Sequence, residues 1–303
     1  MPEPLLAGSA EQLLELAAFE AEDYAEAVPL LATAPDEATS SCLQLLRERL
    51  GRSDLPALST PPSAREETRG SGWQSSAEEL LWLEAYLRFL PEQLAWYRER
   101  NIPDSVIQQT MADIGRQTAI SRRTLGRFGI ETWQWLAEQA SGMLYQLGRL
   151  QFQLGSMPAE LKALDGEIST EANILNIHIP ESGPLTAPEV LSSLLAAPGF
   201  FAEFFPEQPV RYARCVSWLL DPYLVEQLPA HANISQFSRL FTPYGTGKES
   251  NEDAVYFVFR TREHHDVSAL PRATTLQRIV TERIESGGSW RIVQGYLDLG
   301  GFS

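Results

Sequence analysis

The segment RCVSWLLDP, from Arg214 to Pro222, sets a thiol and a hydroxyl two residues apart in a largely apolar stretch. Side chains alternate between the two faces of a strand, so Cys215 and Ser217 would share one face there. A second apolar segment, NILNIHIP, contains His178, whose imidazole titrates near neutral pH. If the two segments are neighbouring strands, the imidazole could act as a general base or could activate the thiol as a nucleophile.

The same residues also have a purely structural interpretation. A single histidine on a strand, or a single buried cysteine, is more often a packing residue than a catalytic one. Asp221 and Pro222 have the pattern of a helix N-cap followed by a first-turn proline, which predicts a helix over PYLVEQLP. Trp218 falls on the face opposite to Cys215 and is expected in the core. The sequence leaves both interpretations open.

The composition argues against several classes of partner. The net charge of −16 argues against nucleic acid or an anionic membrane surface. The two cysteines, Cys42 and Cys215, are too few for a disulfide framework or a zinc cluster. The first residues, MPEPLLAGSAEQ, carry acid where a signal peptide carries base, and Glu203 interrupts the most apolar segment. We therefore expect a soluble cytoplasmic protein that needs no metal.

Residues 1–140 are predicted to form an all-helical N-terminal domain. Apolar residues recur at helical spacing in this part, and the clearest stripe is Leu80, Leu83, Leu87 and Leu90. Pro91 is expected to begin a new helix. Residues 52–72 are rich in proline and small residues, which predicts an exposed loop.

From about Leu144 the apolar period changes to two, and residues 141–303 are predicted to form a second domain. Strands are expected at LYQLGRLQFQL, NILNIHIP, VRYARCVSWLL, AVYFVFRT and WRIVQGYLDL. Helices are expected between them, including TAPEVLSSLLAA, with Thr186 as its N-cap and Glu189 completing a capping box, and a separate short helix from Pro198. Strands separated by helices predict an α/β domain, α+β for the whole chain, with helices on both faces of a sheet.

Two short motifs resemble sites of other chemistry but lack required residues. GTGKES at 245–250 differs from a phosphate-binding P-loop because Thr242 replaces the first glycine and Glu249 replaces the Ser or Thr. A strand is also expected after it, where a P-loop has a helix. EHHD, with His264, His265 and Asp266, has no third spaced ligand for a metal.

No acid lies between Asp113 and Glu131. The four arginines of this stretch form the strongest basic cluster of the chain: Arg116, Arg122, Arg123 and Arg127. Guanidinium groups suit phosphate recognition, so Arg122 and Arg123 are candidate ligands of an anionic cofactor. The alternative is that they complement the dipole at the C-terminal end of a helix.

A series of short strings carries a resemblance to a known family. The strings are LGRLQF, HIP, a capped helix running into FF and FP, SWLLDP, and LP and NI followed by spaced phenylalanines. In this order they resemble, from about Ile102 to Phe241, the bacterial acyltransferase-domain proteins in which a helical N-acyltransferase N-terminal domain precedes a GNAT-like C-terminal domain. The resemblance implies a GNAT-like mixed sheet in residues 141–303.

In GNAT enzymes, acyl-CoA lies where two neighbouring parallel strands part, with its pyrophosphate at the N-terminus of the next helix. A helix N-terminus offers N–H groups and a positive dipole end to phosphate. The resemblance identifies the strand with NILNIHIP and the phosphate loop with ESGPLTAPEV. The expected cofactor-binding residues are therefore Ile177, Ile179, Ser182, Gly183 and Thr186, together with Arg122 and Arg123.

The chain departs from the family pattern at two places. The GNAT phosphate loop is R/Q-x-x-G-x-G/A, and only Gly183 of it is present, while Pro184 and Pro188 lack an N–H group. The second place is Val216, which this chain has where the family pattern Cys-His-Ser-Trp-Leu-Leu has its histidine. Any chemical role of that histidine is therefore lost here.

The resemblance implies an acyl-CoA-dependent N-acyltransferase that moves a small acyl group from acetyl-CoA or another acyl-CoA to an amine. His178 would take a proton from the amine, and Cys215 or Ser217 would protonate the departing thiolate. Two alternatives stay open: thioester chemistry with Cys215 as a nucleophile activated by His178, and a non-catalytic binding or regulatory protein on the same fold. The expected partner is a small-molecule or amine acceptor, and neither nucleic acid nor a membrane.

Overall fold

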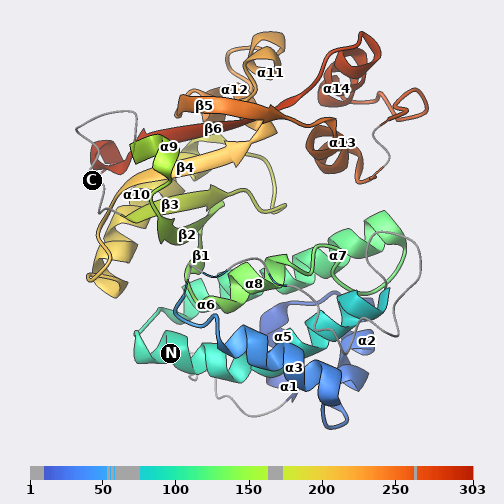
Figure 1. The fold of residues 1–303 in the computed structure, drawn as a ribbon, viewed down its shortest axis with the longest axis vertical. Helices are drawn as coiled ribbons and strands as arrows, with labels where there is room; N and C mark the ends of the chain where they lie inside the picture. Colours follow the sequence, from blue (N-terminus) through green and yellow to red (C-terminus); the bar gives the residue numbers. More distant parts are fainter. Residues whose placement is uncertain are drawn as a thin grey trace. The chain divides into compact units, whose positions relative to one another are not determined.

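The computed structural model describes residues 10–52, 55, 58, 76–162, 173–262 and 265–302, and Figure 1 shows its ribbon. Most of the predicted loop 52–72 lies outside these residues, as does His264. The chain forms two compact units. The first comprises Met1–Leu147, Gln151–Gly155 and Pro180–Ser182, and the second comprises Gly148–Leu150, Ser156–Ile179 and Gly183–Ser303.

Helices make up most of the first unit, as the apolar spacing predicts. They are α1 (Ala10–Ala17), α2 (Ala21–Leu31), α3 (Glu37–Arg47), α5 (Ser76–Glu99), α6 (Asp104–Met111), α7 (Asp113–Leu125) and α8 (Trp135–Ala140), followed by strand β1 (Leu144–Leu147). Within the described part of the chain, every helix is too short or too polar to cross a bilayer.

Two helices continue through prolines that are predicted to begin new helices. α5 runs uninterrupted through Pro91, and α10 (Ala187–Phe204) runs through Pro198. An internal proline removes one hydrogen bond of the helix. Apolar side chains are buried on both sides of each proline, such as Leu87 and Leu94 in α5 and Phe201 in α10. Burial of these helix faces offsets the lost hydrogen bond. The predictions that new helices begin at Pro91 and at Pro198 are therefore wrong.

The remaining elements follow from Leu150 onward. They are β2 (Leu150–Ser156), α9 (Ala159–Lys162), β3 (Asn173–His178), α10, β4 (Val210–Ser217), a 3-10 helix (Trp218–Leu220), α11 (Pro222–Gln227), α12 (Asn233–Ser238), β5 (Thr242–Glu249), α13 (Asn251–Phe259), α14 (Thr275–Glu285), β6 (Arg291–Asp298) and a last 3-10 helix (Leu299–Phe302). The strands form one six-stranded sheet in the order β1-β2-β3-β4-β6-β5. β3 and β4 are parallel, whereas β6 is antiparallel to both β4 and β5, so the sheet is mixed, as predicted.

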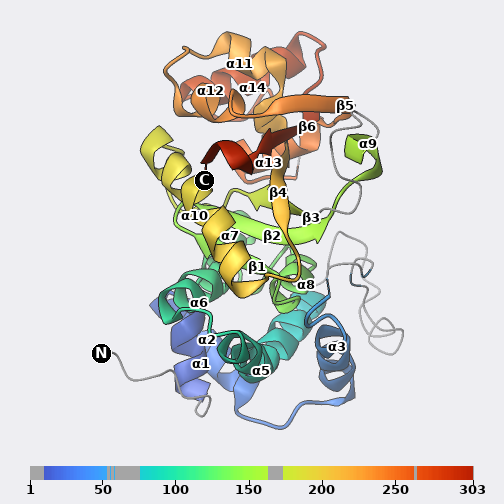
Figure 2. The same cartoon turned by 90° about the vertical axis from the view of Figure 1, so that its left-hand side faces the viewer.

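Strand register separates the two faces of the sheet in the second unit. Ile174 and Tyr212 are Cα partners and pack with Leu161 of α9, which defines the α9 face. Cys215, the Cα partner of Gly295, lies three residues after Tyr212 on β4, so its side chain points to the other face. Figure 2 shows α9 and α10 on opposite sides of β3 and β4, and we call this other face the α10 face. Helices on both faces confirm the predicted fold class.

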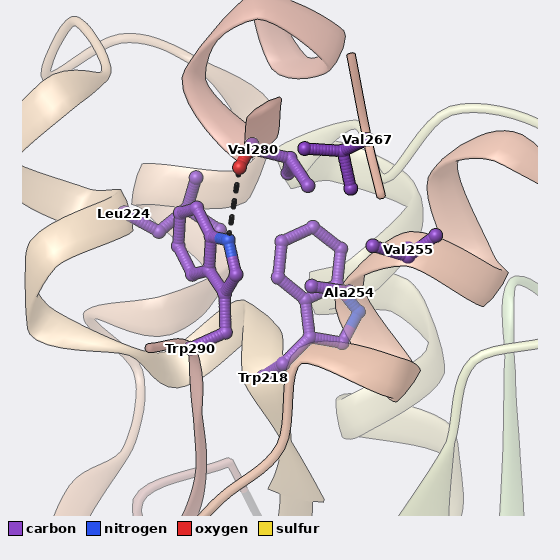
Figure 3. Close-up of a cluster of buried hydrophobic side chains, with 7 residues drawn as sticks. All are labelled: Trp218, Leu224, Ala254, Val255, Val267, Val280 and Trp290. Atoms are coloured by element: carbon purple, nitrogen blue, oxygen red, sulfur yellow. Dashed lines mark hydrogen bonds between the residues drawn. The ribbon is translucent and has the colours of Figure 1, made fainter. Parts of the chain in front are cut away.

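A second apolar core lies where α11, α13 and α14 meet (Figure 3). The rings of Trp218 and Trp290 meet edge to face with centroids 5.6 Å apart, and Trp290 Nε1 donates to the carbonyl of Val280 at 3.3 Å. This confirms Trp218 as a packing residue. Asp221 caps α11 as predicted, because its carboxylate accepts from the N–H of Tyr223 at 2.9 Å.

The segment AVYFVFRT, predicted as a strand, instead belongs to helix α13 as far as Phe259. Its β-branched and aromatic residues favour a strand locally. Ala254 and Val255 are fully buried in the cluster around Trp218 and Trp290, and this tertiary packing overrides the local preference. A helix therefore does follow GTGKES. Lys248 nevertheless lies in β5, paired with Ile292, so its backbone belongs to the sheet and forms no phosphate cradle.

Candidate active site

The parallel strands β3 and β4 stop pairing before either of them ends. The last Cα partners are Asn176 and Arg214, although β3 continues to His178 and β4 to Ser217. On its other side, β4 stays paired with β6 as far as Ser217. The two described strand ends therefore run on without a ladder between them, beside the loop that leads to α10.

His178 is the last residue of β3 and is half-buried. Strand alternation puts its side chain on the α9 face, together with Asn176. Arg214 points to the same face, because its Nε donates to Asn176 Oδ1 at 2.5 Å. Val216 follows two residues later on β4 and is 49% exposed. His178 therefore borders a solvent-accessible part of the α9 face.

Cys215 lies on the opposite face from His178, so the structure does not bring the thiol and the imidazole together. The Cys215 side chain is only 2% exposed, and burial raises the pKa of its thiol to about 12. A buried thiol with such a pKa is almost entirely protonated near neutral pH. This argues against Cys215 as a nucleophile.

Ser217 shares the α10 face with Cys215 and ends β4. Its hydroxyl oxygen accepts from the N–H of Leu219 at 3.1 Å and so caps the short 3-10 helix that follows. The hydroxyl hydrogen is not used in that bond, so the group can still donate a proton or a hydrogen bond.

The predicted phosphate loop follows β3 and is exposed from Glu181 to Pro184. Ile177 is buried on the α10 face, and Ile179 is half-buried. Gly183 has φ +121°, in the region that favours glycine, and a Cβ there would meet no atom within 4 Å. The glycine is therefore required by the backbone and not by close packing.

Arg149, which the sequence analysis did not single out, holds this loop. Its Nε donates to the carbonyl of Pro184 at 3.0 Å, and a terminal nitrogen donates to the carbonyl of Gly183 at 2.6 Å. The Arg149 N–H donates to Ser193 Oγ of α10 at 2.9 Å, and the side chain is only 8% exposed. No local signal in LGRLQF singles it out, because only the structure shows that this arginine is buried and therefore needs partners.

Thr186 occupies the N-cap position of α10 as predicted, but its side chain makes no cap hydrogen bond. Its hydroxyl instead donates to a carboxylate oxygen of Glu189. The first-turn N–H groups of α10 are therefore not occupied by Thr186, whereas Pro188 contributes none.

The basic cluster, three of whose four arginines lie in α7, is engaged by acidic side chains. Arg122 donates to Glu22 at 2.9 Å, Asp23 at 2.6 Å and Glu26 at 2.7 Å, and the hydrogen bond with Glu26 is the largest cause of its raised pKa. These three carboxylates use the guanidinium, which argues against a role of Arg122 in binding a cofactor. Arg123 pairs at 2.5 Å with Glu181, so it does contact the predicted phosphate loop.

One open cavity of about 450 Å³ lies elsewhere in the second unit, lined by Lys248, Glu249, Ser250, Asn251, Glu252, His265, Ile284 and Ser289. It contains none of the predicted site residues. Within the described ranges, the acidic, histidine and cysteine side chains form no group that could hold a metal ion.

Two family models match the chain. The N-acyltransferase N-terminal domain matches residues 8–142, and the GNAT-like C-terminal domain matches residues 144–297. The second match alone covers more than half of the chain. No curated protein matches the sequence.

Several solved structures are similar to this chain over nearly its whole length. One is an acyltransferase in complex with decanoyl-CoA, 28% identical, with a TM-score of 0.80 over 98% of this chain and 90% of that one. Two others are an acyltransferase with decanoyl-CoA and teicoplanin and one with CoA and 10C-teicoplanin. Each of these is 28% identical, with a TM-score of 0.81 over 99% of this chain and 91% of the other.

Proposed function

Because the chain belongs to the family in which an N-acyltransferase N-terminal domain precedes a GNAT-like C-terminal domain, we propose that it transfers an acyl group from acyl-CoA to an amine. The observation that carries the proposal is the parting of β3 and β4 beyond Asn176 and Arg214. A pantetheine chain offers amide groups that can pair with such unpaired strand edges. The similar acyltransferases that bind decanoyl-CoA support this choice of cofactor.

In the proposed complex, acyl-CoA lies between the ends of β3 and β4. Ile177 and Ile179 line the pantetheine and thioester, while Ser182, Gly183 and Thr186 lie at the phosphates, with the N-terminus of α10. Arg149 is a positioning residue, since its bonds to the carbonyls of the loop fix the loop backbone. Arg149 would in this way fix a loop that lacks the glycine-rich sequence of the GNAT pattern, and it would add positive charge beside the phosphates.

The proposed reaction is a direct transfer. The lone pair of the amine attacks the thioester carbonyl, the C–S bond breaks, and the electrons leave with the sulfur as a thiolate. His178 accepts the proton that the amine nitrogen loses, because it faces the accessible side of the sheet and imidazole suits this role near pH 7. Ser217, on the other face, is the proposed hydrogen-bond donor to the thiolate, which takes its proton from water.

Thioester chemistry at Cys215 has less support, because burial raises the pKa of that thiol and the register separates it from His178. The non-catalytic alternative predicts binding without turnover. The length of the acyl group stays a prediction. The small acyl group expected from the sequence is to be compared with the decanoyl group carried by the similar structures.

The test combines binding and turnover. Calorimetry with acetyl-CoA, decanoyl-CoA and ADP measures affinity, and release of free CoA thiol in the presence of amines measures transfer. We expect binding in the micromolar range and a His178→Gln variant that binds acyl-CoA normally but loses at least about 100-fold in kcat, the size of a general-base contribution. His231→Gln, at an exposed histidine, is the matched control. Absence of binding at millimolar acyl-CoA contradicts the proposal.

A further inference from the structure

Arg214 differs from the arginines of the basic cluster because it has no acidic partner among the residues that the structure describes. It is half-buried on the α9 face, between Asn176 of β3 and Tyr296 of β6, which are its Cα partners. Its Nε donates to Asn176 Oδ1 at 2.5 Å. Neither terminal guanidinium nitrogen has a partner among the described residues. In a chain of net charge −16, a partly buried cation without a counter-ion is unusual.

The described strand neighbours of Arg214 on this face supply no negative charge. By register and alternation they are His178, Val216, Gln294 and Tyr296. The acid that register places closest is Asp298, opposite Tyr212, and Arg211 holds its carboxylate at 2.8 Å. We call Asn176, His178, Arg214, Val216, Gln294 and Tyr296 the Arg214 patch. It is positive, partly exposed and carries apolar surface at Val216 and Tyr296.

A second polar group beside the patch is also unsatisfied. Tyr244 is the Cα partner of Gln294, and its ring packs edge to face on that of Tyr296 at 6.0 Å. The side chain is only 4% exposed, and its hydroxyl has no hydrogen-bond partner among the described residues. Buried polar groups nearly always have a partner, which can be an ordered water or a ligand.

We propose that the acceptor amine carries a carboxylate and that Arg214 binds this carboxylate. The inference rests on the proposed function, because it places the acceptor on the face that His178 borders. His178 lies two residues beyond Asn176, so the base and the cation are about 7 Å apart along the strands. One acceptor can therefore place its amine at His178 and its carboxylate at Arg214. The ring of Tyr296 and the methyl groups of Val216 suit an acceptor with an apolar body.

An anion at Arg214 could also come from a phosphate of acyl-CoA. The proposed phosphate site lies in residues 182–186, beyond the end of β3, whereas Arg214 is aligned with Asn176 inside the strand. This position favours the acceptor, and the experiment separates the two sources.

The experiment compares two acceptors of equal shape, 4-(aminomethyl)benzoate and 4-(aminomethyl)benzamide, with decanoyl-CoA or acetyl-CoA as donor. Since a hydrogen-bonded charge pair is lost with the amide, we expect kcat/KM about 10- to 100-fold higher for the carboxylate. Arg214→Gln should abolish this preference, and Arg214→Lys should keep part of it. Arg211→Gln, at an exposed arginine of the same strand, should leave the preference unchanged.

Two further readouts keep the inference separable from the proposed function. Arg214→Gln should leave the Kd of acyl-CoA and of ADP unchanged; a higher Kd for either would assign Arg214 to the cofactor and overturn the proposal. Calorimetric binding of 4-(aminomethyl)benzoate to the protein without acyl-CoA should be lost in Arg214→Gln. If acyl-CoA fails to bind but this amine still binds through Arg214, the acyltransferase assignment fails and the carboxylate site stands. If the wild-type protein does not prefer the carboxylate in either assay, the proposal is wrong.

Discussion

Arg122 allows a sharp test of whether the α7 arginines are structural or bind a cofactor. Its side chain is 21% exposed and meets the Asp23 carboxylate, whose side chain is 1% exposed. The second oxygen of that carboxylate, Asp23 Oδ2, has no hydrogen-bond partner in the described part of the chain. Arg122→Ala would therefore leave a buried carboxylate without a counter-charge.

The expected cost can be worked from these contacts. Removing one partner of a buried ion pair costs about 3–5 kcal/mol, and the partial exposure of Arg122 places it at the lower end, about 3 kcal/mol. The pairs with Glu22 and Glu26 add little, because these carboxylates are 70% and 50% exposed. Arg123→Ala, on the next residue of α7, breaks a pair that is about half exposed on both sides and should cost ~0–1 kcal/mol.

Urea unfolding of the two variants measures the difference. With a slope of about 1–3 kcal/mol per M, Arg122→Ala should lower the midpoint of the first unit by about 1 M or more. Asp23→Asn in the Arg122→Ala background should recover part of the loss, since it removes the unpaired charge. The Kd of acyl-CoA should not change in Arg122→Ala. Equal stability of the Arg122→Ala and Arg123→Ala variants, or no recovery by Asp23→Asn, would refute the reasoning.

Three further predictions use other parts of the chain. Cys42 and Cys215 are both buried, and burial raises the pKa of each thiol to about 12. At pH 8 both thiols of the native protein should therefore react with a thiol reagent ~10³-fold more slowly than free cysteine, and both should react in denaturant. A single fast-reacting thiol in the native protein would contradict this. Asp36 caps α3 through Thr39 N–H at 2.7 Å, and this bond lowers its pKa from 3.8; Asp36→Ala should cost about 1 kcal/mol at pH 7. Because the pKa of Asp36 is lower in the folded protein than in the unfolded chain, the cap contributes its full stability above pH 3.8 and loses it as the pH falls through the folded-state pKa. The urea midpoints of wild type and variant should therefore converge at that low pH. A difference between the midpoints that stays constant with pH would exclude the cap. Arg149→Ala should raise the Kd of acyl-CoA about tenfold or more. The same change should not alter kcat/KM for an acyl-N-acetylcysteamine donor, because that donor lacks the nucleotide. An equal loss with both donors would mean that Arg149 has only a structural role.

Much of the fold follows from local sequence patterns. The change from helical to strand periodicity near Leu144, the cap at Asp221 and the core position of Trp218 are all visible in the sequence. The errors at Pro91, Pro198 and the α13 segment have one physical cause. In each case tertiary burial overrides a local preference, and burial partners distant in sequence cannot be read from local spacing.

The candidate site was less predictable. The sequence identifies the strand that ends in His178 and the loop around Gly183, but the opposite faces of His178 and Cys215 depend on the register between β3 and β4. The partners of Arg122 lie about 100 residues away in sequence, so its neutralisation by acids could not be foreseen. Arg149 and Arg214 look like ordinary surface arginines until burial and register are known.

Hydrogen exchange with and without decanoyl-CoA, followed by mass spectrometry, tests the central claim most directly, because it reports both binding and its place. If acyl-CoA lies between the ends of β3 and β4, amide exchange should slow in residues 177–190 and 214–219 and stay unchanged around the cavity at 248–252 and 284–289. Protection confined to that cavity, or no protection at millimolar decanoyl-CoA or acetyl-CoA, would contradict the account.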